Sequence, residues 1–413
     1  MGFTNALKKL TALALACVML PAALSACGMK PQNPDPTEVP HTTPLPEAPC
    51  TKTHYIRYWP EDADYETCDY ACTIEKPEFS MEHYAGGYLN AAVEGYIEDL
   101  EERIERQYMP AAIAHPPYTQ VSCEVEYVNG VTNIVFTEKH CFEAQPFTET
   151  HAYMFDDRGG EINMRDIFLS YRAEERVAEL IARSIKDRPG YYQADANTVL
   201  AAIDVQHGAK ATEDGCVVYV KAGLLAPYEE GELAFVVKFA DVCPDFVGRV
   251  MSADEYRMAA ELMSYAAAAA AIRGENIENG EISPFTATKF MGLVAPTLGI
   301  APSAGRINVP AERFESVFRG CFGVDFPGVD KDAPDIEVKD GFYCVLASRA
   351  GYECNVDMAE AAVEDGLIVI RGDVMDGRYG SPVSSYICHA VVRLERAPGS
   401  PFGFILRGYT ASV

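Results

Sequence analysis

The stretch "HAYMFDDRGGEINMRDIF", residues 151–168, decides how the middle of the chain is interpreted. An aromatic, apolar segment leads into two adjacent carboxylates, Asp156 and Asp157, which are followed by the pair Gly159 and Gly160. The carboxylates are either a catalytic acid pair or part of a turn between two strands. Asp side chains accept hydrogen bonds from nearby backbone groups, and Gly adopts positive φ at low cost. We therefore interpret the stretch as a strand, a turn and the short strand "INM".

The alternative of a metal-dependent acid pair can be tested against the rest of the sequence. "FDDRG" is superficially similar to the "TFDDG" motif of polysaccharide deacetylases, in which one Asp is a base and the other joins two His around a divalent metal. That site needs a His-x-x-x-His pair, because imidazoles four residues apart share a helix face. After residue 157 the only histidines are His207 and His389. The sequence therefore predicts no metal site and no cofactor.

The segments before this stretch predict a strand, a long helix and a hairpin. "THYIRYWP" is typical of an opening strand. "VSCEVEYV" and "TNIVFTEKHCF" flank an Asn-Gly pair, which is a strong hairpin signal. A helix is predicted over about residues 82–108, where apolar side chains recur at helical spacing, at Leu89, Val93, Ile97, Leu100 and Ile104.

The segments after it predict two helices and a closing pair of strands. A helix over about residues 172–186 ends before Pro189-Gly190, and "ADANTVLAAIDV" is typical of a shorter helix. "CVVYVKAG" and "LAFVVKFADV" are the closing strands. The order of strands, helix, strands, helices and strands favours an α+β domain with a mainly antiparallel sheet over residues 51–248.

In order and spacing, this domain resembles a paired module of extracytoplasmic Gram-positive proteins whose halves are domains of unknown function. The module forms the outer part of lysozyme-sensing anti-sigma factors (RsiV type) and precedes the catalytic domain of peptidoglycan deacetylases (PdaC type). The matching residues of its central motif are Tyr153, Phe155, Asp157, Gly160, Ile162, Met164, Asp166 and Phe168. Those of its closing corner are Ala226, Pro227, Tyr228 and Gly231. The resemblance implies an extracytoplasmic binding domain, and neither the anti-sigma nor the deacetylase activity is carried over.

The N-terminus predicts a lipid anchor. Residues 1–26 combine Lys8 and Lys9, an apolar block and small residues before Cys27, which resembles the lipobox of bacterial lipoproteins. Cys27 would be acylated, and two acyl chains are enough for stable attachment to a membrane. Residues 27–50 are rich in Pro and poor in apolar residues, which predicts a disordered tether. We expect the chain on the outer face of the cell membrane of a bacterium.

A second α+β domain is predicted over residues 252–413. A helix begins at the capping box from Ser252 to Glu255 and stops at Gly274, and another begins at Pro310. Four or five strands follow, with turns rich in Gly, Asp and Pro: "GFYCVLAS", "YECNVDMAEAAVE", "GLIVIRGDVM", "SSYICHAVVRLE" and "FGFILRGY". Each predicted domain is therefore a mainly antiparallel sheet packed with helices.

The cysteines suggest two disulfides. Outside the cytoplasm thiols can oxidise, and two pairs each flank a predicted strand and its return: Cys216 with Cys243, and Cys344 with Cys354. A lineage that tolerates free thiols is equally consistent with the sequence. Cys321 and His389 could also meet as a thiol and its base, but no local signature supports that pairing.

Charge and motifs together predict a binding protein. The formal net charge of −27 repels phosphate backbones, which excludes nucleic acid as a partner and leaves the acyl chains as the membrane contact. No GxSxG elbow or other catalytic motif occurs. We expect a non-catalytic lipoprotein that binds a basic protein such as lysozyme, or wall glycan. The alternative is a cell-envelope hydrolase with an unfamiliar active site.

Overall fold

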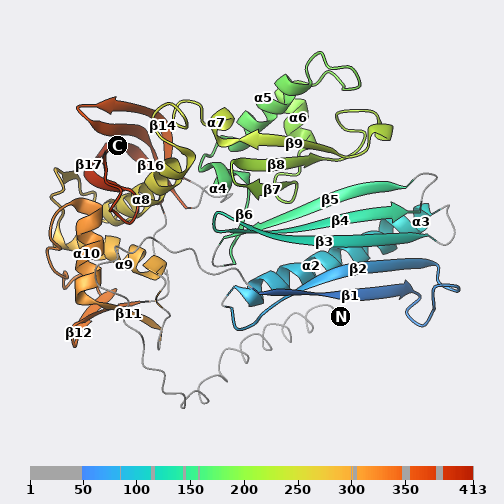
Figure 1. Ribbon diagram of the computed structural model, residues 1–413, viewed down its shortest axis with the longest axis horizontal. Coiled ribbons are helices and arrows are strands. Elements are labelled where there is room, and N and C mark those ends of the chain that lie inside the picture. The colour runs from blue at the N-terminus through green and yellow to red at the C-terminus, as the bar shows by residue number, and fades with distance from the viewer. Residues whose placement is uncertain are drawn as a thin grey trace, which may run out of the picture. The chain divides into compact units, whose positions relative to one another are not determined.

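The computed structural model describes residues 49–412, except 84, 113–116, 143–145, 157–158, 299, 301–304, 347–353 and 378–384. These residues belong to one compact unit, Val39–Val413. It is an α+β structure of mainly antiparallel sheets packed with helices, as predicted (Figure 1). No helix in the described ranges is long and apolar enough to cross a bilayer.

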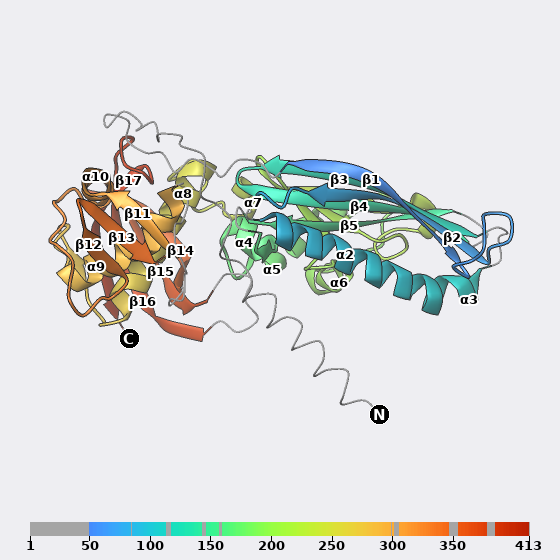
Figure 2. The same ribbon diagram turned by 90° about the horizontal axis from the view of Figure 1, so that it is seen from below.

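The first layer is a six-stranded sheet with α2 on one face. Its strands follow chain order: β1 (Cys50–Trp59), β2 (Tyr70–Phe79), β3 (Tyr118–Val128), β4 (Val131–Cys141), β5 (Phe147–Phe155) and β6 (Glu161–Ile162). All neighbours are antiparallel except β2 and β3, which α2 (Gly86–Arg103) connects as a crossover. A π-helical turn (Ile104–Tyr108) and the short α3 (Met109–Ala111) continue α2. Figure 2 shows α2 running along the sheet.

The predicted helix and hairpin of this layer are confirmed. The five apolar residues predicted to face inward from the helix are all buried against the sheet. The hairpin turns at Asn129 and Gly130, with φ of 51° and 81°, as a two-residue hairpin loop requires. Strand β2 was not predicted, because Pro77 interrupts its pattern. Pro77 is tolerated because β3 pairs only with Ala71 to Ile74, so no ladder donor is needed on that side.

A three-stranded sheet and small helices follow. The sheet order is β7 (Ala209–Thr212), β8 (Gly215–Val220) and β9 (Leu233–Lys238). It is accompanied by α4 (Met164–Phe168), α5 (Ala173–Ile185), α6 (Ala196–Ala202), the 3-10 turn Tyr228–Glu230 and α7 (Phe239–Val242). The predicted helices near residues 172–186 and in "ADANTVLAAIDV" are thus confirmed, and "LAFVVKFADV" divides into β9 and α7.

The C-terminal part contains two more sheets. Its helices are α8 (Ala253–Ala271), α9 (Pro284–Val294), the 3-10 turn Ala295–Leu298 and α10 (Ala311–Phe322). One sheet has the order β10 (Ile277–Glu278), β17 (Phe404–Ser412), β16 (Ser385–Arg396), β15 (Leu367–Asp376) and β14 (Cys354–Glu364). The other has the order β11 (Arg306–Pro310), β13 (Phe342–Leu346) and β12 (Ile336–Lys339). The capping box of Ser252 and the meander from β14 to β17 are as predicted, whereas β13 belongs to the smaller sheet.

The apolar core does not divide where the two domains were predicted to meet. One cluster lies under α2 and extends from Trp59 to Phe155. A second, larger cluster extends from Met154 to Tyr409 and includes both Phe246 and Tyr256. The predicted boundary between residues 248 and 252 therefore falls inside a continuous core.

Two glycines of α2 give a matched test of how closely α2 packs against the preceding loop. A Cβ on Gly86 would lie 2.1 Å from the carbonyl oxygen of Ser80, whereas a Cβ on Gly95 would meet nothing within 4 Å. Gly86→Ala is expected to destabilise the fold by about 1–3 kcal/mol through overpacking. Gly95→Ala is expected to stabilise it by about 0.5–1 kcal/mol, because Ala loses less entropy in a helix. Urea unfolding of both variants measures the difference, and equal effects would contradict the close contact at Gly86.

Candidate functional site

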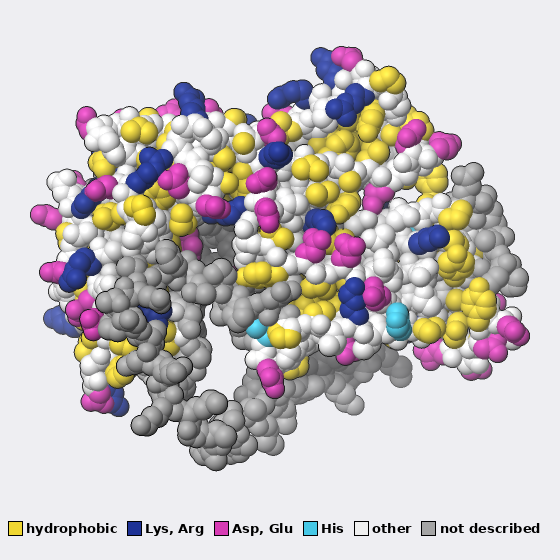
Figure 3. Space-filling model, viewed as in Figure 1, with side chains coloured by type: hydrophobic (Ala, Val, Ile, Leu, Met, Phe, Trp, Pro, Cys, Tyr) yellow, Lys and Arg dark blue, Asp and Glu magenta, His cyan; other side chains and the backbone are white. Residues whose placement is uncertain are grey.

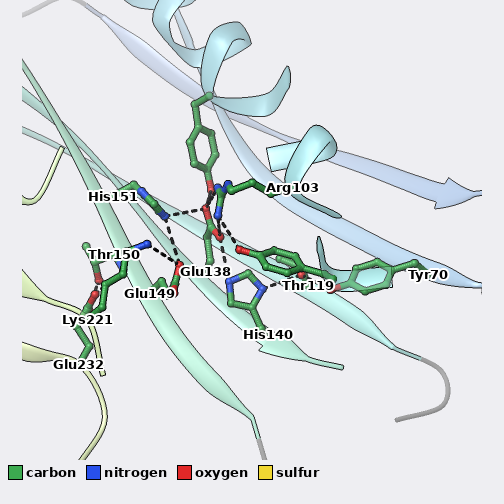
Figure 4. A network of polar contacts seen from close by, with 12 residues as sticks. Tyr70, Arg103, Thr119, Glu138, His140, Glu149, Thr150, His151, Lys221 and Glu232 are labelled. Carbon is green, nitrogen blue, oxygen red and sulfur yellow. Dashed lines mark hydrogen bonds and ion pairs between the residues drawn. The ribbon is translucent and has the colours of Figure 1, made fainter. Parts of the chain in front are cut away.

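Two neighbouring strands carry the same short pattern, Thr-Glu-x-His. On β4 it places Glu138 and His140, and on β5 it places Glu149 and His151. Side chains two residues apart point to the same face of a strand. The register pairs Glu138 directly with Glu149, so all four side chains gather on the face that α2 covers (Figure 4). We call these four residues the Glu–His cluster.

Glu138 is the centre of the cluster and is completely buried. Arg103 of α2 donates two hydrogen bonds to its carboxylate, at 2.6 Å to Oε1 and 2.9 Å to Oε2. The Tyr96 hydroxyl donates a third, at 3.0 Å to Oε1. Burial alone would raise the pKa of Glu138, but the neighbouring His140 and Arg103 hold the pKa well below its ordinary value. Glu138 is therefore a carboxylate anion fixed by donors from α2.

A polar chain orients His140. The Tyr70 hydroxyl lies 2.8 Å from Thr119 Oγ1, and Thr119 Oγ1 lies 2.9 Å from His140 Nδ1. Burial raises the pKa of the Tyr70 hydroxyl, so it stays protonated and can donate. His140 itself is fully buried and packs edge-on against Tyr108. This chain fixes one ring nitrogen and directs the other, Nε2, toward Glu138.

The β5 side of the cluster is more open and has its own partners. Glu149 lies 3.3 Å from the Lys221 ammonium and 3.8 Å from His151 Nε2. Burial would raise the pKa of Glu149, but the His151 and Lys221 contacts lower it. Nearby, Glu232 accepts a hydrogen bond of 2.7 Å from the Thr150 backbone N–H, and burial raises its pKa. The cluster thus reaches the surface along β5.

Both cluster histidines present a buried nitrogen with no well-directed hydrogen bond. His140 Nε2 lies 3.0 Å from Glu138 Oε2, and His151 Nε2 lies 3.4 Å from Glu138 Oε1. These are ion-pair distances, yet neither nitrogen makes a hydrogen bond of acceptable geometry. Carboxylate and imidazole donors of Glu138, His140 and Glu149 lie within 4.8 Å of one another, which suits a metal ion.

The sequence reasoning missed this site. It considered only a His-x-x-x-His pair on a helix. The available signal was the repeated Glu-x-His, at residues 138–140 and 149–151. The first copy lies on a predicted strand, whereas Glu149 lies just before the strand predicted in the opening stretch. His140 and Cys141 do point to opposite faces, as the strand assignment requires, since only His140 is buried.

Asp156 of the opening stretch takes part in a turn, as predicted. Asp156 Oδ1 accepts a hydrogen bond of 2.7 Å from the Gly160 backbone N–H, and Gly159 has a φ of 79°. Asp157 lies outside the described residues, and so does the predicted lipid-attachment residue Cys27.

The four cysteines predicted to form disulfides are free thiols in the structure. Cys216 is buried in β8, and Cys243 Sγ contacts the Tyr256 hydroxyl at 3.8 Å. Cys344 and Cys354 belong to different sheets. Burial raises the pKa of Cys216 and of Cys354 to about 12, which makes both poor nucleophiles.

Cys321 and His389 do not form the thiol–base pair that was considered. Cys321 is buried in α10, and burial raises the pKa of its thiol. His389 is exposed on β16, where its Nδ1 contacts Asp373.

A separate cavity of about 430 Å³ lies next to the opening stretch. Asp156 and Asp166 line it from one side, and Arg257 and Glu261 line it from α8. The remaining walls are largely apolar side chains, including Ile167 and others from neighbouring elements. The cavity combines polar groups with an apolar surface, which is typical of small-molecule sites.

Comparison with known proteins finds weak structural similarity and shows no family for the chain. No family model and no curated protein matches the chain. A DUF3298 family protein from Pseudomonas aeruginosa is 15% identical, with a TM-score of 0.33, and the match covers 48% of this chain and 93% of that one. A DUF3298 family member from Bacteroides fragilis is 14% identical, with a TM-score of 0.30, over 47% and 90% of the two chains. Such values transfer no function.

Proposed function

We propose that this chain is a non-catalytic, lipid-anchored binding protein of the outer face of the cell membrane, and that its ligand is a basic protein such as lysozyme. The observation that carries the proposal is a row of carboxylates on the exposed side of α2 and of the π-helical turn that continues it. The net charge of −27 and the resemblance to the RsiV/PdaC-type module support it.

We call this row the acidic stripe, and three of its members are regularly spaced along the helix. Its exposed members are Glu94, Glu98, Asp99, Glu102 and Glu105. Glu94, Glu98 and Glu102 follow one another at intervals of four residues, so they stack along one line of the helix over about 12 Å. Like charges at this spacing destabilise a helix by about 0.2–0.5 kcal/mol per pair. A binding role would account for keeping them there.

The stripe is only partly neutralised from within the chain. Lys76 pairs with Glu94 and Arg106 pairs with Glu102. Glu98 and Asp99 have no ion-pair partner within the described ranges. On the face drawn in Figure 3, by contrast, acidic and basic side chains are interspersed. The stripe is therefore a surface that a cationic partner would recognise by charge.

Glu98→Lys is expected to separate binding from stability. It converts two repulsive pairs into attractive ones, so the free energy of unfolding should rise by roughly 0.8–2 kcal/mol. The same change should weaken lysozyme binding by about 10-fold at low salt and much less at high salt. Binding of the full chain in mild detergent to immobilised lysozyme, at two salt concentrations, measures the effect.

Glu360→Lys is the matched control for this test. Glu360 is an exposed residue of β14, and its substitution changes the net charge by the same amount. It should leave lysozyme binding within about twofold of the natural chain, because the altered charge lies outside the stripe. Equal losses in both variants would show that only net charge matters, and no binding by the natural chain would exclude lysozyme as ligand.

A cell-envelope hydrolase is the second candidate, and the cavity beside α8 is the observation that favours it. Its carboxylates and apolar walls could hold part of a substrate. Incubation of the full chain with purified peptidoglycan, followed by measurement of soluble fragments, tests this candidate. Fragment release that is lost in Glu261→Gln would favour the hydrolase over the binding protein.

A further inference from the structure

We propose that the Glu–His cluster binds one divalent transition-metal ion, with Zn²⁺ as the best-matched ion, through donors from β4 and β5. This inference goes beyond the proposed function, which concerns the outer side of α2. It begins from the four side chains of the cluster, which present two carboxylates and two imidazoles on one face of the sheet. Zn²⁺ accepts this mixture of nitrogen and oxygen donors.

The two histidine nitrogens are the first reason. His140 is completely buried, and its Nε2 has no hydrogen bond of acceptable geometry although it points at carboxylate oxygens. His151 Nε2 is also buried and has no hydrogen bond of acceptable geometry. A buried polar atom without a well-directed hydrogen bond is costly. A metal ion between these nitrogens and the carboxylates would accept the lone pair of each nitrogen.

The way His140 is held is the second reason. A metal-binding histidine usually uses its other ring nitrogen to donate a hydrogen bond that fixes the ring. His140 Nδ1 lies 2.9 Å from Thr119 Oγ1, which is itself held by Tyr70. With the proton on Nδ1, the lone pair of Nε2 faces the cluster.

Charge is the third reason. Glu138 and Glu149 are direct cross-strand partners, an arrangement that is unfavourable without a cation. Glu232 brings a third carboxyl group beside Thr150. Arg103 and Lys221 are the two cations that contact these groups in the described part of the chain. Three carboxyl groups therefore share two cations, and a metal ion would add positive charge to this set.

Arg103 is compatible with this role. Arg103 donates one hydrogen bond to each carboxylate oxygen of Glu138, and Tyr96 donates a second one to Oε1. Oε2 keeps a free direction on the side of His140 Nε2. Arg103 would then orient the carboxylate as an outer partner of the metal ligand, and Glu149 and His151 would complete the set from the more open side.

Titration of the full chain with Zn²⁺ alone tests the proposal. The chain is purified in mild detergent without a histidine tag and treated with a chelator, and binding is followed by calorimetry. Co²⁺ is titrated in parallel, because its visible spectrum reports bound nitrogen and oxygen donors. We expect one equivalent to bind, and we expect Glu149→Gln and His151→Gln to weaken binding by about 100-fold or more, above the 10–100-fold typical of outer-shell changes.

His389→Gln is the matched control. His389 also contacts a carboxylate, that of Asp373, but this pair is exposed and belongs to no metal-ligating cluster among the described residues. This variant should bind Zn²⁺ as the natural chain does. The Glu149 and His151 positions are at the open side, so the two substitutions should leave the far-UV circular dichroism unchanged. Absence of stoichiometric binding by the natural chain, or equal binding by all three variants, would overturn the proposal.

Discussion

Arg103→Met is expected to lower the free energy of unfolding by about 3–5 kcal/mol. The substitution keeps the apolar stem of the side chain but removes the guanidinium that donates twice to Glu138. Glu138 is fully buried, so its charge would be left with only the Tyr96 hydroxyl and imidazole contacts. Breaking one half of a buried ion pair costs far more than the pair contributes, because the remaining charge is not solvated.

Urea unfolding followed by circular dichroism measures this loss. Arg371→Met is the control, because Arg371 pairs with Glu364 on the surface and both side chains are nearly half exposed. Exposed pairs contribute about 0–1 kcal/mol, so this variant should unfold almost as the natural chain does. Adding Glu138→Gln to Arg103→Met should recover part of the loss, since a neutral amide is cheaper to bury. Similar losses for Arg103→Met and Arg371→Met would contradict the role assigned to Glu138.

The elements that sequence reasoning predicted are those whose signal is local. The helix α2 was predictable from the spacing of Leu89, Val93 and Ile97, and the β3–β4 hairpin from Asn129-Gly130. The capping box at Ser252 likewise needs only four adjacent residues. Strand β2 was missed because Pro77 interrupts its pattern. That β3 does not pair with β2 at Pro77 is a property of the tertiary structure and cannot be seen in the local sequence.

The Glu–His cluster could not be assembled from local signals alone. Alternation shows that Glu138 and His140 share a face, and that Glu149 and His151 share a face. Only the register of β4 against β5 brings the two pairs together, and a shift of one residue would separate them. Glu is also mostly exposed in proteins, so the burial of Glu138 under α2 goes against the general tendency.

Phe318→Ala is the second large prediction, and it also tests the continuity of the core. Phe318 of α10 is fully buried and packs on the rings of Phe322 and Phe326, at 4.7 and 5.1 Å between centroids. Removing the ring should destabilise the fold by about 3–5 kcal/mol through lost contacts and a cavity. Phe342→Ala is the matched control, because Phe342 is 41% exposed and should cost less than about 1 kcal/mol.

The single tryptophan shows how far this loss spreads. Trp59 is buried in the other core cluster, under α2, so its fluorescence reports on the part that does not contain Phe318. Strand β5 joins the clusters, because Met154 belongs to the larger and Phe155 to the smaller. We therefore expect Trp59 fluorescence and circular dichroism to shift together to lower urea in Phe318→Ala, as in one cooperative transition. If the fluorescence transition stayed at its natural position while circular dichroism shifted, the two cores would be independent folding units.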